Sequence, residues 1–130
     1  MALTRRNVLK LAGLWAAAGS TGFGSAREGK DMYGLISKIK TVAGQRDALI
    51  TILIDGTSTM PGCLSYIVAK DSADGETIWV TEVWESRASH QASLSLPAVQ
   101  QAMAKGKPLI AAFGERFETQ PVGGHGLAAA

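Results

Sequence analysis

The chain has 130 residues, of which 46% are hydrophobic and 18% are charged, and this composition fits one small globular domain without room for a second. The formal charge at pH 7 is +2, but Arg5, Arg6 and Lys10 lie within the first 26 residues, which contain no acidic residue. The rest of the chain therefore has a formal charge of 2 − 3 = −1, so no basic surface indicates nucleic acid as a partner.

Residues 1–26 have the layout of an export signal peptide, in which cations precede a short apolar run and small residues follow it. Residues 4–10, with the sequence TRRNVLK, resemble the twin-arginine export motif. The apolar run is too short and too rich in alanine and glycine to span a membrane, so we expect cleavage near residues 24–26 and no stable membrane insertion afterwards. The protein would then be periplasmic or otherwise exported. An ordinary first helix, or a start assigned too early, is the alternative, and the protein would then be cytoplasmic.

A strand and a helix follow the leader. Residues 32–40 form a short apolar run with partial alternation, which predicts a first strand, and Gly44 ends it. Residues 45–55 place apolar side chains at helical spacing and predict a helix that is covered over most of its surface. Residues 56–62 contain a Pro-Gly pair and predict a loop.

Two strands and a tight turn come next. Residues 63–70 alternate, and strict alternation places Cys63 and Tyr66 on opposite faces of a second strand. Residues 71–75 end in Asp-Gly, which predicts a hairpin turn. Residues 77–84 are rich in β-branched and aromatic side chains and predict a central third strand.

The last part of the domain has two helical stretches and a fourth strand. Ser86 has the profile of an N-cap and predicts a helix that runs to about residue 94. Pro97 is acceptable in the first turn of a helix and opens the second stretch. Residues 112–120 alternate well enough to predict the fourth strand.

The order strand, helix, strand, strand, helix, strand is the split βαβ pattern of a ferredoxin-like α+β fold. We assign this domain to residues 32–122 and expect residues 123–130 to form a flexible tail. The strands are apolar on both faces, whereas a four-stranded sheet with helices on one side would leave its other face to solvent. The second apolar face therefore predicts a homodimer.

Glu82 is the unusual residue of the third strand. Alternation places it on the same face as Trp84, so a carboxylate shares a covered face with an indole. A buried carboxylate needs a partner or a raised pKa. A salt bridge or a dimer contact with Arg87 or a lysine would be the structural explanation.

His90 is the single histidine of the folded core, and it lies one turn into the helix that follows the third strand. Cys63 is the only cysteine, so the domain cannot contain an internal disulfide. Two histidines and one cysteine without ligand-type spacing argue against a metal site.

Three motifs at consistent spacing resemble one known family. They are residues 61–66 (PGCLSY), residues 81–86 (TEVWES) and His90. Together they resemble the antibiotic biosynthesis monooxygenase family, particularly its quinol monooxygenase branch, over the whole inferred domain. The resemblance implies a dimeric α/β barrel with a pocket between the sheet and the helices of each subunit. It also implies oxidation of small electron-rich aromatics, such as anthrones and quinols, by molecular oxygen without metal, flavin or haem.

The implied reaction suggests roles for four residues. A quinol or anthrone becomes a strong electron donor to oxygen once it is deprotonated, and His90, with an ordinary pKa of about 6.5, would be the base. Glu82 would orient the imidazole or hold a substrate hydroxyl, while Trp84 and Tyr66 would stack against a flat ring. The simpler interpretations are a solvated or capping histidine and two aromatic core residues.

Of three other functions found on this fold, the sequence argues against the first and leaves two open. A haem-degrading branch of the fold places an axial histidine on the helix after the one that carries His90, but residues 97–107 contain no histidine, cysteine or tyrosine. An isomerase branch that acts on small phosphorylated signalling molecules has a histidine at that place, although only Arg87, Lys105 and Lys107 could supply the cations that a phosphate needs. The third is a non-enzymatic ligand-binding or stress-associated dimer, because a fold alone decides no function.

Overall fold

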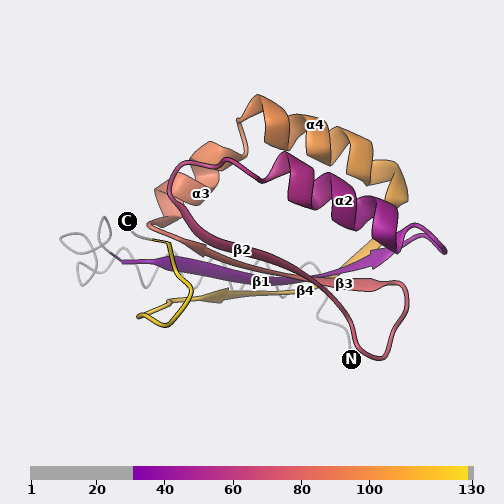
Figure 1. Cartoon of the computed structure of the whole chain (residues 1–130), viewed down its shortest axis with the longest axis horizontal. Helices are drawn as coiled ribbons and strands as arrows, with labels where there is room; N and C mark the ends of the chain where they lie inside the picture. Colours follow the sequence, from indigo (N-terminus) through magenta and orange to yellow (C-terminus); the bar gives the residue numbers. More distant parts are fainter. Residues whose placement is uncertain (1–30, 129–130) are drawn as a thin grey trace, which may run out of the picture.

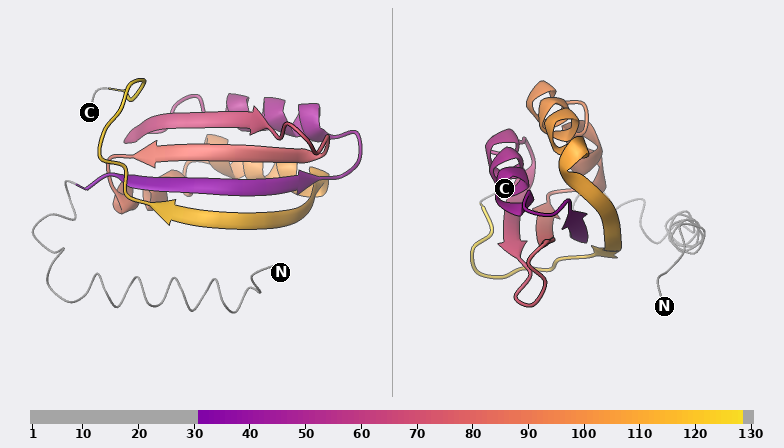
Figure 2. Two further views of the ribbon diagram at one scale, coloured as in Figure 1. Left: turned by 90° about the horizontal axis from the view of Figure 1, so that it is seen from below. Right: turned by 90° about the vertical axis from the view of Figure 1, so that its right-hand side faces the viewer.

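The computed structural model describes residues 31–128, which form a four-stranded antiparallel sheet with helices on one face (Figures 1 and 2). The elements are β1 (Tyr33–Thr41), α2 (Arg46–Gly56), β2 (Cys63–Lys70), β3 (Thr77–Trp84), α3 (Arg87–Ser93), α4 (Pro97–Gly106), the short 3₁₀ helix η1 (Lys107–Leu109) and β4 (Ile110–Thr119). The predicted leader lies outside the described residues. Within residues 31–128, no helix has the length and apolar character that a membrane span requires.

The strands lie in the order β2-β3-β1-β4, and each neighbouring pair is antiparallel. This order, with the helices on one face, is the ferredoxin-like α+β fold, so the predicted fold class is confirmed. The alternation in the sequence gives the bounds of β2 and β3 correctly. The last strand begins at Ile110 rather than at residue 112. The helical stretch before it ends with η1 at Leu109, so the strand can start at the next residue.

The core lies between the sheet and the helices and has two parts. The part next to α2 is aliphatic and comprises Ile39, Leu49, Ile78 and Val80. The part next to α3 contains both aromatic and aliphatic side chains and comprises Tyr33, Leu35, Met60, Trp84 and Val99. The second cluster surrounds the residues that the sequence singles out, so the candidate site lies at the α3 end of the core.

A β-bulge at the start of β2 changes which residues face the helices. Cys63 pairs with Trp84, whereas Ser65 pairs with the residue just before Trp84, so Leu64 is the extra residue of the bulge. Cys63 therefore faces the helices together with Tyr66, and both pack against the aromatic cluster. The prediction that Cys63 and Tyr66 lie on opposite faces is wrong, because alternation reverses across a bulge.

No described helix covers the outer face of the sheet (Figure 2). This face carries an apolar row. Strand pairing aligns Ile67, Thr81, Ile36 and Phe117 across the four strands. The exposed fractions are 56% for Ile67 and 44% for Phe117. The second apolar face expected from the sequence is present, and the homodimer that it predicts remains a prediction.

Candidate functional site

The start of α3 places His90 inside the molecule. Ser86 Oγ accepts a hydrogen bond from the backbone N–H of Ser89 at 3.1 Å, so the predicted N-cap is confirmed. One turn later the side chain of His90 points toward the sheet, and only 6% of the residue is exposed. The cap fixes where the helix begins and therefore which side chain of its first turn faces the core.

Two aromatic rings flank the imidazole of His90. Its ring centroid lies 5.4 Å from that of Tyr33, with a 43° tilt, and 5.5 Å from that of Trp84, in an edge-to-face arrangement. His90 Nδ1 is buried and has no hydrogen-bond partner among the residues that the structure describes. An unpaired buried polar atom is uncommon in folded proteins and is a feature of sites that bind ligands.

The surroundings of His90 favour its neutral form. Burial lowers the pKa of the imidazole, and the positive charges of Arg116 and Arg87 lower it further, against the opposing effect of Glu118. A neutral imidazole has one nitrogen that can accept a proton. His90 can therefore act as a base at neutral pH.

Glu82 lies on the helix-facing side of β3, in one row with Tyr66 of β2 and Leu35 of β1. Its Oε1 accepts a hydrogen bond from the indole Nε1–H of Trp84 at 3.0 Å. Burial raises the pKa of Glu82, although the bond from Trp84 and the charge of Arg116 act in the opposite direction. None of the ion pairs within residues 31–128 includes Glu82, and Arg87 pairs with Glu118 instead.

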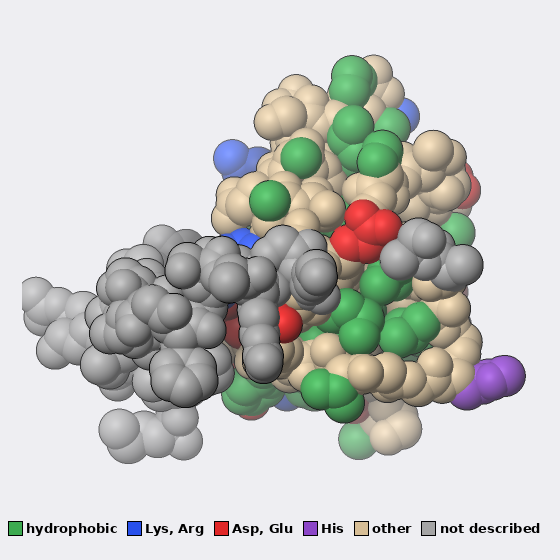
Figure 3. All heavy atoms as spheres, turned by 90° about the vertical axis from the view of Figure 1, so that its left-hand side faces the viewer, with side chains coloured by type: hydrophobic (Ala, Val, Ile, Leu, Met, Phe, Trp, Pro, Cys, Tyr) green, Lys and Arg blue, Asp and Glu red, His purple; other side chains and the backbone are tan. Residues whose placement is uncertain are grey.

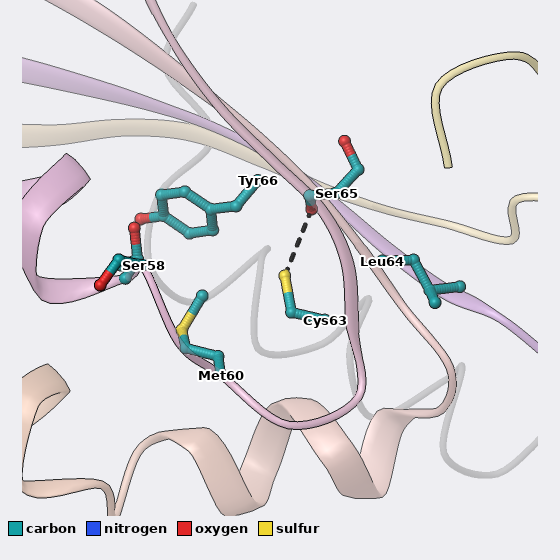
Figure 4. Close-up of a pocket in the computed structure, with 7 residues that line it drawn as sticks. Ser58, Met60, Cys63, Leu64, Ser65 and Tyr66 are labelled. Carbon is teal, nitrogen blue, oxygen red and sulfur yellow. Dashed lines mark hydrogen bonds between the residues drawn. The ribbon is translucent and has the colours of Figure 1, made fainter. Parts of the chain in front are cut away.

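Tyr66 borders an open pocket of about 260 Å³ at the start of β2. The pocket is lined by Thr57, Ser58, Met60, Cys63, Leu64, Ser65 and Tyr66. Figure 4 shows Tyr66, Met60 and Cys63 on one side of β2 and Leu64 on the other. Burial, with the nearby Glu82, raises the pKa of the Tyr66 hydroxyl well above its usual range, so this hydroxyl remains a proton donor at neutral pH.

A second cavity, of about 520 Å³, opens between α3 and the ends of β1 and β4. It is lined by Asp31, Met32, Tyr33, Ser86, Arg87, Ala88, Gln91, Glu118, Thr119 and Gln120. Figure 3 views the molecule from the side where α3 lies and shows hydrophobic side chains at the surface of the helical layer and again below it. Tyr33 belongs to the lining and also contacts His90, so this cavity lies next to the buried imidazole.

The sequence does not single out two residues that act on this site, Tyr33 and Arg116. Tyr33 is brought beside His90 because it pairs with Trp84 in the antiparallel register of β1 and β3. Arg116 pairs with Ser37 of β1, and its positive charge favours the deprotonated forms of Tyr33, His90 and Glu82, although burial is the larger effect on each pKa. Only the long-range strand register could have identified either residue.

Within the part of the chain that the structure describes, no three His, Cys, Asp or Glu side chains gather as metal ligands would. The expectation that no metal or cofactor takes part remains a prediction. The four residues named from the sequence do lie together, since Trp84 contacts both His90 and Glu82, and Tyr66 packs against the same aromatic cluster.

Comparison with protein families matches residues 32–105 to the family described as antibiotic biosynthesis monooxygenase. The chain belongs to the antibiotic biosynthesis monooxygenase family. The resemblance inferred from the three sequence motifs is thereby confirmed at the level of the family. None of the curated proteins matches the chain.

Solved structures support the same assignment. A protein of Chloroflexus aurantiacus J-10-fl assigned to the antibiotic biosynthesis monooxygenases is 64% identical, with a TM-score of 0.73 over 75% of this chain and 99% of the other. A second such protein, from Caulobacter crescentus CB15, is 17% identical, with a TM-score of 0.66 over 75% and 96% of the two chains. A third, from Nitrosomonas europaea, is 13% identical, with a TM-score of 0.62 over 72% and 91%. The last two similarities show the shared fold alone.

Proposed function

We propose that this protein is a cofactor-independent monooxygenase that oxidises quinol- or anthrone-like aromatics with molecular oxygen. The observation that carries the proposal is the buried imidazole of His90, whose Nδ1 lacks a partner within residues 31–128 and which lies between two aromatic rings. A buried polar atom without a partner costs free energy, and a substrate hydroxyl or acidic C–H group would supply that partner. Membership of the antibiotic biosynthesis monooxygenase family supports the same chemistry.

The proposed reaction begins with a proton transfer to His90. For an anthrone, His90 removes one proton from the ring methylene, and the resulting carbanion gives electrons to oxygen so that a C–O bond forms. His90 then returns the proton to the peroxide, and loss of water leaves a ketone. One oxygen atom enters the product and the other leaves as water with the two methylene hydrogens, so the substrate supplies all the electrons.

The other predicted residues would bind and orient the substrate. Burial raises the pKa of Glu82 and favours its protonated form, so one oxygen can accept from Trp84 while the other donates to a substrate hydroxyl or carbonyl. Trp84 and Tyr66 would stack against the flat ring. A hydrogen bond between Glu82 and His90 is not part of the proposal, because the partner of Glu82 in the structure is the indole of Trp84.

Oxygen uptake by the full-length chain tests the proposal. A panel of quinols and anthrones is compared with the uncatalysed oxidation of each compound, beside His90→Ala and the matched control His125→Ala, which removes an exposed histidine of the C-terminal segment. We expect saturable uptake that survives a chelator, falls about 10²–10⁴-fold in His90→Ala and is unchanged in His125→Ala. The thermal stability of His90→Ala should remain sufficient for folding at the assay temperature.

Two results would contradict the proposal in different ways. If all three proteins match the blank across the panel, the oxygenase is abandoned and a ligand-binding dimer takes its place. If His90→Ala retains the activity of the folded wild type, the reaction stands but His90 is not its base.

We also propose that two copies pack through the outer faces of their sheets, where Ile67, Ile36 and Phe117 form the apolar row. The family's expected partners, a small aromatic substrate and oxygen, would then bind within each copy, between its sheet and its helices.

Export by the twin-arginine leader is part of the same proposal, and a periplasmic fraction free of the full-length chain and its processed form would contradict it.

A further inference from the structure

The helix-facing side of β4 is open at Arg116. Strand pairing places Arg116 opposite Ser37, on the same side of the sheet as Leu35 and the core. Nearly all residues of β4 are exposed, and Figure 2 shows this strand at the edge of the sheet, beside rather than beneath α2 and α4. Arg116 is close enough for its charge to lower the pKa values of Tyr33, Glu82 and His90.

Arg116 is an arginine without a carboxylate partner in the described part of the chain. The ion pairs there are Lys40 with Asp74, Lys70 with Asp47, and Arg87 with Glu118. Arg87 also lies over the ring of Tyr33, with 4.8 Å between the guanidinium carbon and the ring centroid, and is thus held on two sides. Arg116 remains available to a ligand.

The charged side chains that shift the pKa of His90 have a net positive charge. Arg116 and Arg87 lower its pKa and Glu118 raises it, so two cations oppose one carboxylate. Glu82 is not among the charges that shift the pKa of His90. Asp31, at the rim of the larger cavity, and Glu85, beside Gly62 at the start of α3, are further carboxylates on this side, and neither is among the charges that shift the pKa of His90. A positive potential around a buried, uncharged base favours an anionic occupant.

We infer that Arg116 is a substrate-specificity residue of this site, and that it pairs with a carboxylate carried by the aromatic substrate. The reacting ring would lie beside His90 and Tyr33, with its acidic group directed toward β4. This inference deepens the proposed function and rests on it for the identity of the ring. The proposed substrates are therefore acidic quinol-like aromatics rather than neutral ones.

Geometry favours a carboxylate over a second hydroxyl as the group that Arg116 binds. Guanidinium presents two parallel N–H donors that match the two oxygens of a carboxylate, whereas a hydroxyl offers one oxygen. Arg116 pairs with Ser37, which pairs with Val80, so Arg116 lies about 10 Å from Trp84 across the sheet and about 13 Å from it along the strands. The long side chain of Arg116 covers part of that distance, and a hydroxylated ring with an acidic arm, or two fused rings with an acid group, would cover the rest.

Binding of a matched pair of ligands tests this inference apart from turnover. The pair is 3-(2,5-dihydroxyphenyl)propanoate and 3-(2,5-dihydroxyphenyl)propanamide, which share the quinol and the arm and differ in charge, measured by calorimetry with the full-length chain under nitrogen. We expect the wild type to bind the acid about tenfold or more tightly than the amide, because a charge-assisted pair is the difference between them. Arg116→Gln should reduce that ratio to about one, and Arg116→Lys should restore part of it.

Lys105→Gln is the control, since it removes a cation from the last turn of α4 and should leave the preference intact. Equal binding of acid and amide by the wild type, binding of neither, or a preference that survives in folded Arg116→Gln would each overturn the inference. Displacement of the acid by millimolar inorganic phosphate but not by benzoate would also overturn it, in favour of a phosphorylated ligand. If the acid binds in a way that depends on Arg116 but no oxygen is taken up, the carboxylate subsite is supported and the proposed oxygenase activity is contradicted.

Discussion

At the scale of single residues, Trp84 connects the two titratable groups of the site. Its indole donates to Glu82 and its ring lies edge-to-face with the imidazole of His90, while Trp84 itself is fully buried. Burial raises the pKa of Glu82 and lowers that of His90, so both groups are driven toward their uncharged forms. The pKa values of the acid and the base that contact this indole are thereby brought closer together, which suits a reaction that moves a single proton.

Substitution of Glu82 separates its charge from its hydrogen bond. The raised pKa means that folded Glu82 keeps its proton at pH values where the unfolded chain, in which a glutamate has its ordinary pKa of 4.5, has released it. Its stabilising contribution is therefore complete below the pKa of the unfolded chain and is lost as the pH rises through the folded pKa. Glu82→Gln stays neutral and keeps an oxygen for Trp84, so we expect its free energy of unfolding to exceed that of wild type increasingly between pH 4 and pH 8.

Glu82→Ala is the companion variant, because it leaves the buried indole N–H without an acceptor and should cost about 1–3 kcal/mol at every pH. Urea denaturation of the three proteins at pH 4, 6 and 8 provides the measurement. A Glu82→Gln protein that loses as much stability at pH 8 as Glu82→Ala would show that Glu82 is ionised and favourably paired in the folded state.

At the scale of elements, the loop before β2 is fitted against the first turn of α3. The backbone N–H of Glu85 donates to the carbonyl of Gly62 at 2.8 Å, and Gly62 has a φ of +81°. A Cβ at Gly62 would lie 2.5 Å from Ser89 Oγ and 2.6 Å from Ser89 Cβ. Glycine is therefore required there both for its backbone conformation and for the close approach of the loop to α3.

Gly62→Ala and Gly44→Ala form a matched pair, because Gly44 also has a positive φ, of +77°, but a Cβ there would meet open space. Gly44→Ala should cost about 1–2 kcal/mol, the penalty of the left-handed conformation alone. Gly62→Ala should cost clearly more, since it must also displace Ser89, and it should weaken any ligand that depends on His90. Thermal and urea unfolding give both values, and equal losses in the two variants would mean that the loop moves away from α3 freely.

The same elements show which parts of the site are predictable from sequence. Glu82, Trp84 and His90 lie together because one strand alternates regularly and one capped helix follows it, and both signals are local. Cys63 is misplaced because a bulge depends on how β2 pairs with β3, which the residues of β2 do not determine alone. Arg116 and Tyr33 reach the site only through the register of β1 with its two neighbours, and tertiary packing sets that register.

At the scale of the whole molecule, the described helices α2, α3 and α4 cover one face of the sheet (Figure 1). Both faces of the sheet carry apolar side chains. The fold class follows from the order of the elements, which local patterns specify. The outer face is different, because an exposed apolar row indicates that something covers it without specifying what. With strands about 4.8 Å apart and about 3.3 Å per residue, four strands of eight residues present about 500 Å². Two copies would bury about the 1,000 Å² that a specific interface requires.

A charge on the outer face should therefore separate the two copies. Ile67→Lys with Phe117→Lys places two cations in the apolar row, and burying them in a dimer would cost several kcal/mol per ion. Ile54→Lys is the matched control, since Ile54 is 53% exposed but lies on α2, away from the sheet's outer face. We expect light scattering after gel filtration to give twice the chain mass for the wild type and for Ile54→Lys, and the single chain mass for the double variant. A wild type that is monomeric at tens of micromolar, or a double variant that stays dimeric, would place the interface elsewhere or remove it, and the exposed row would then need another partner.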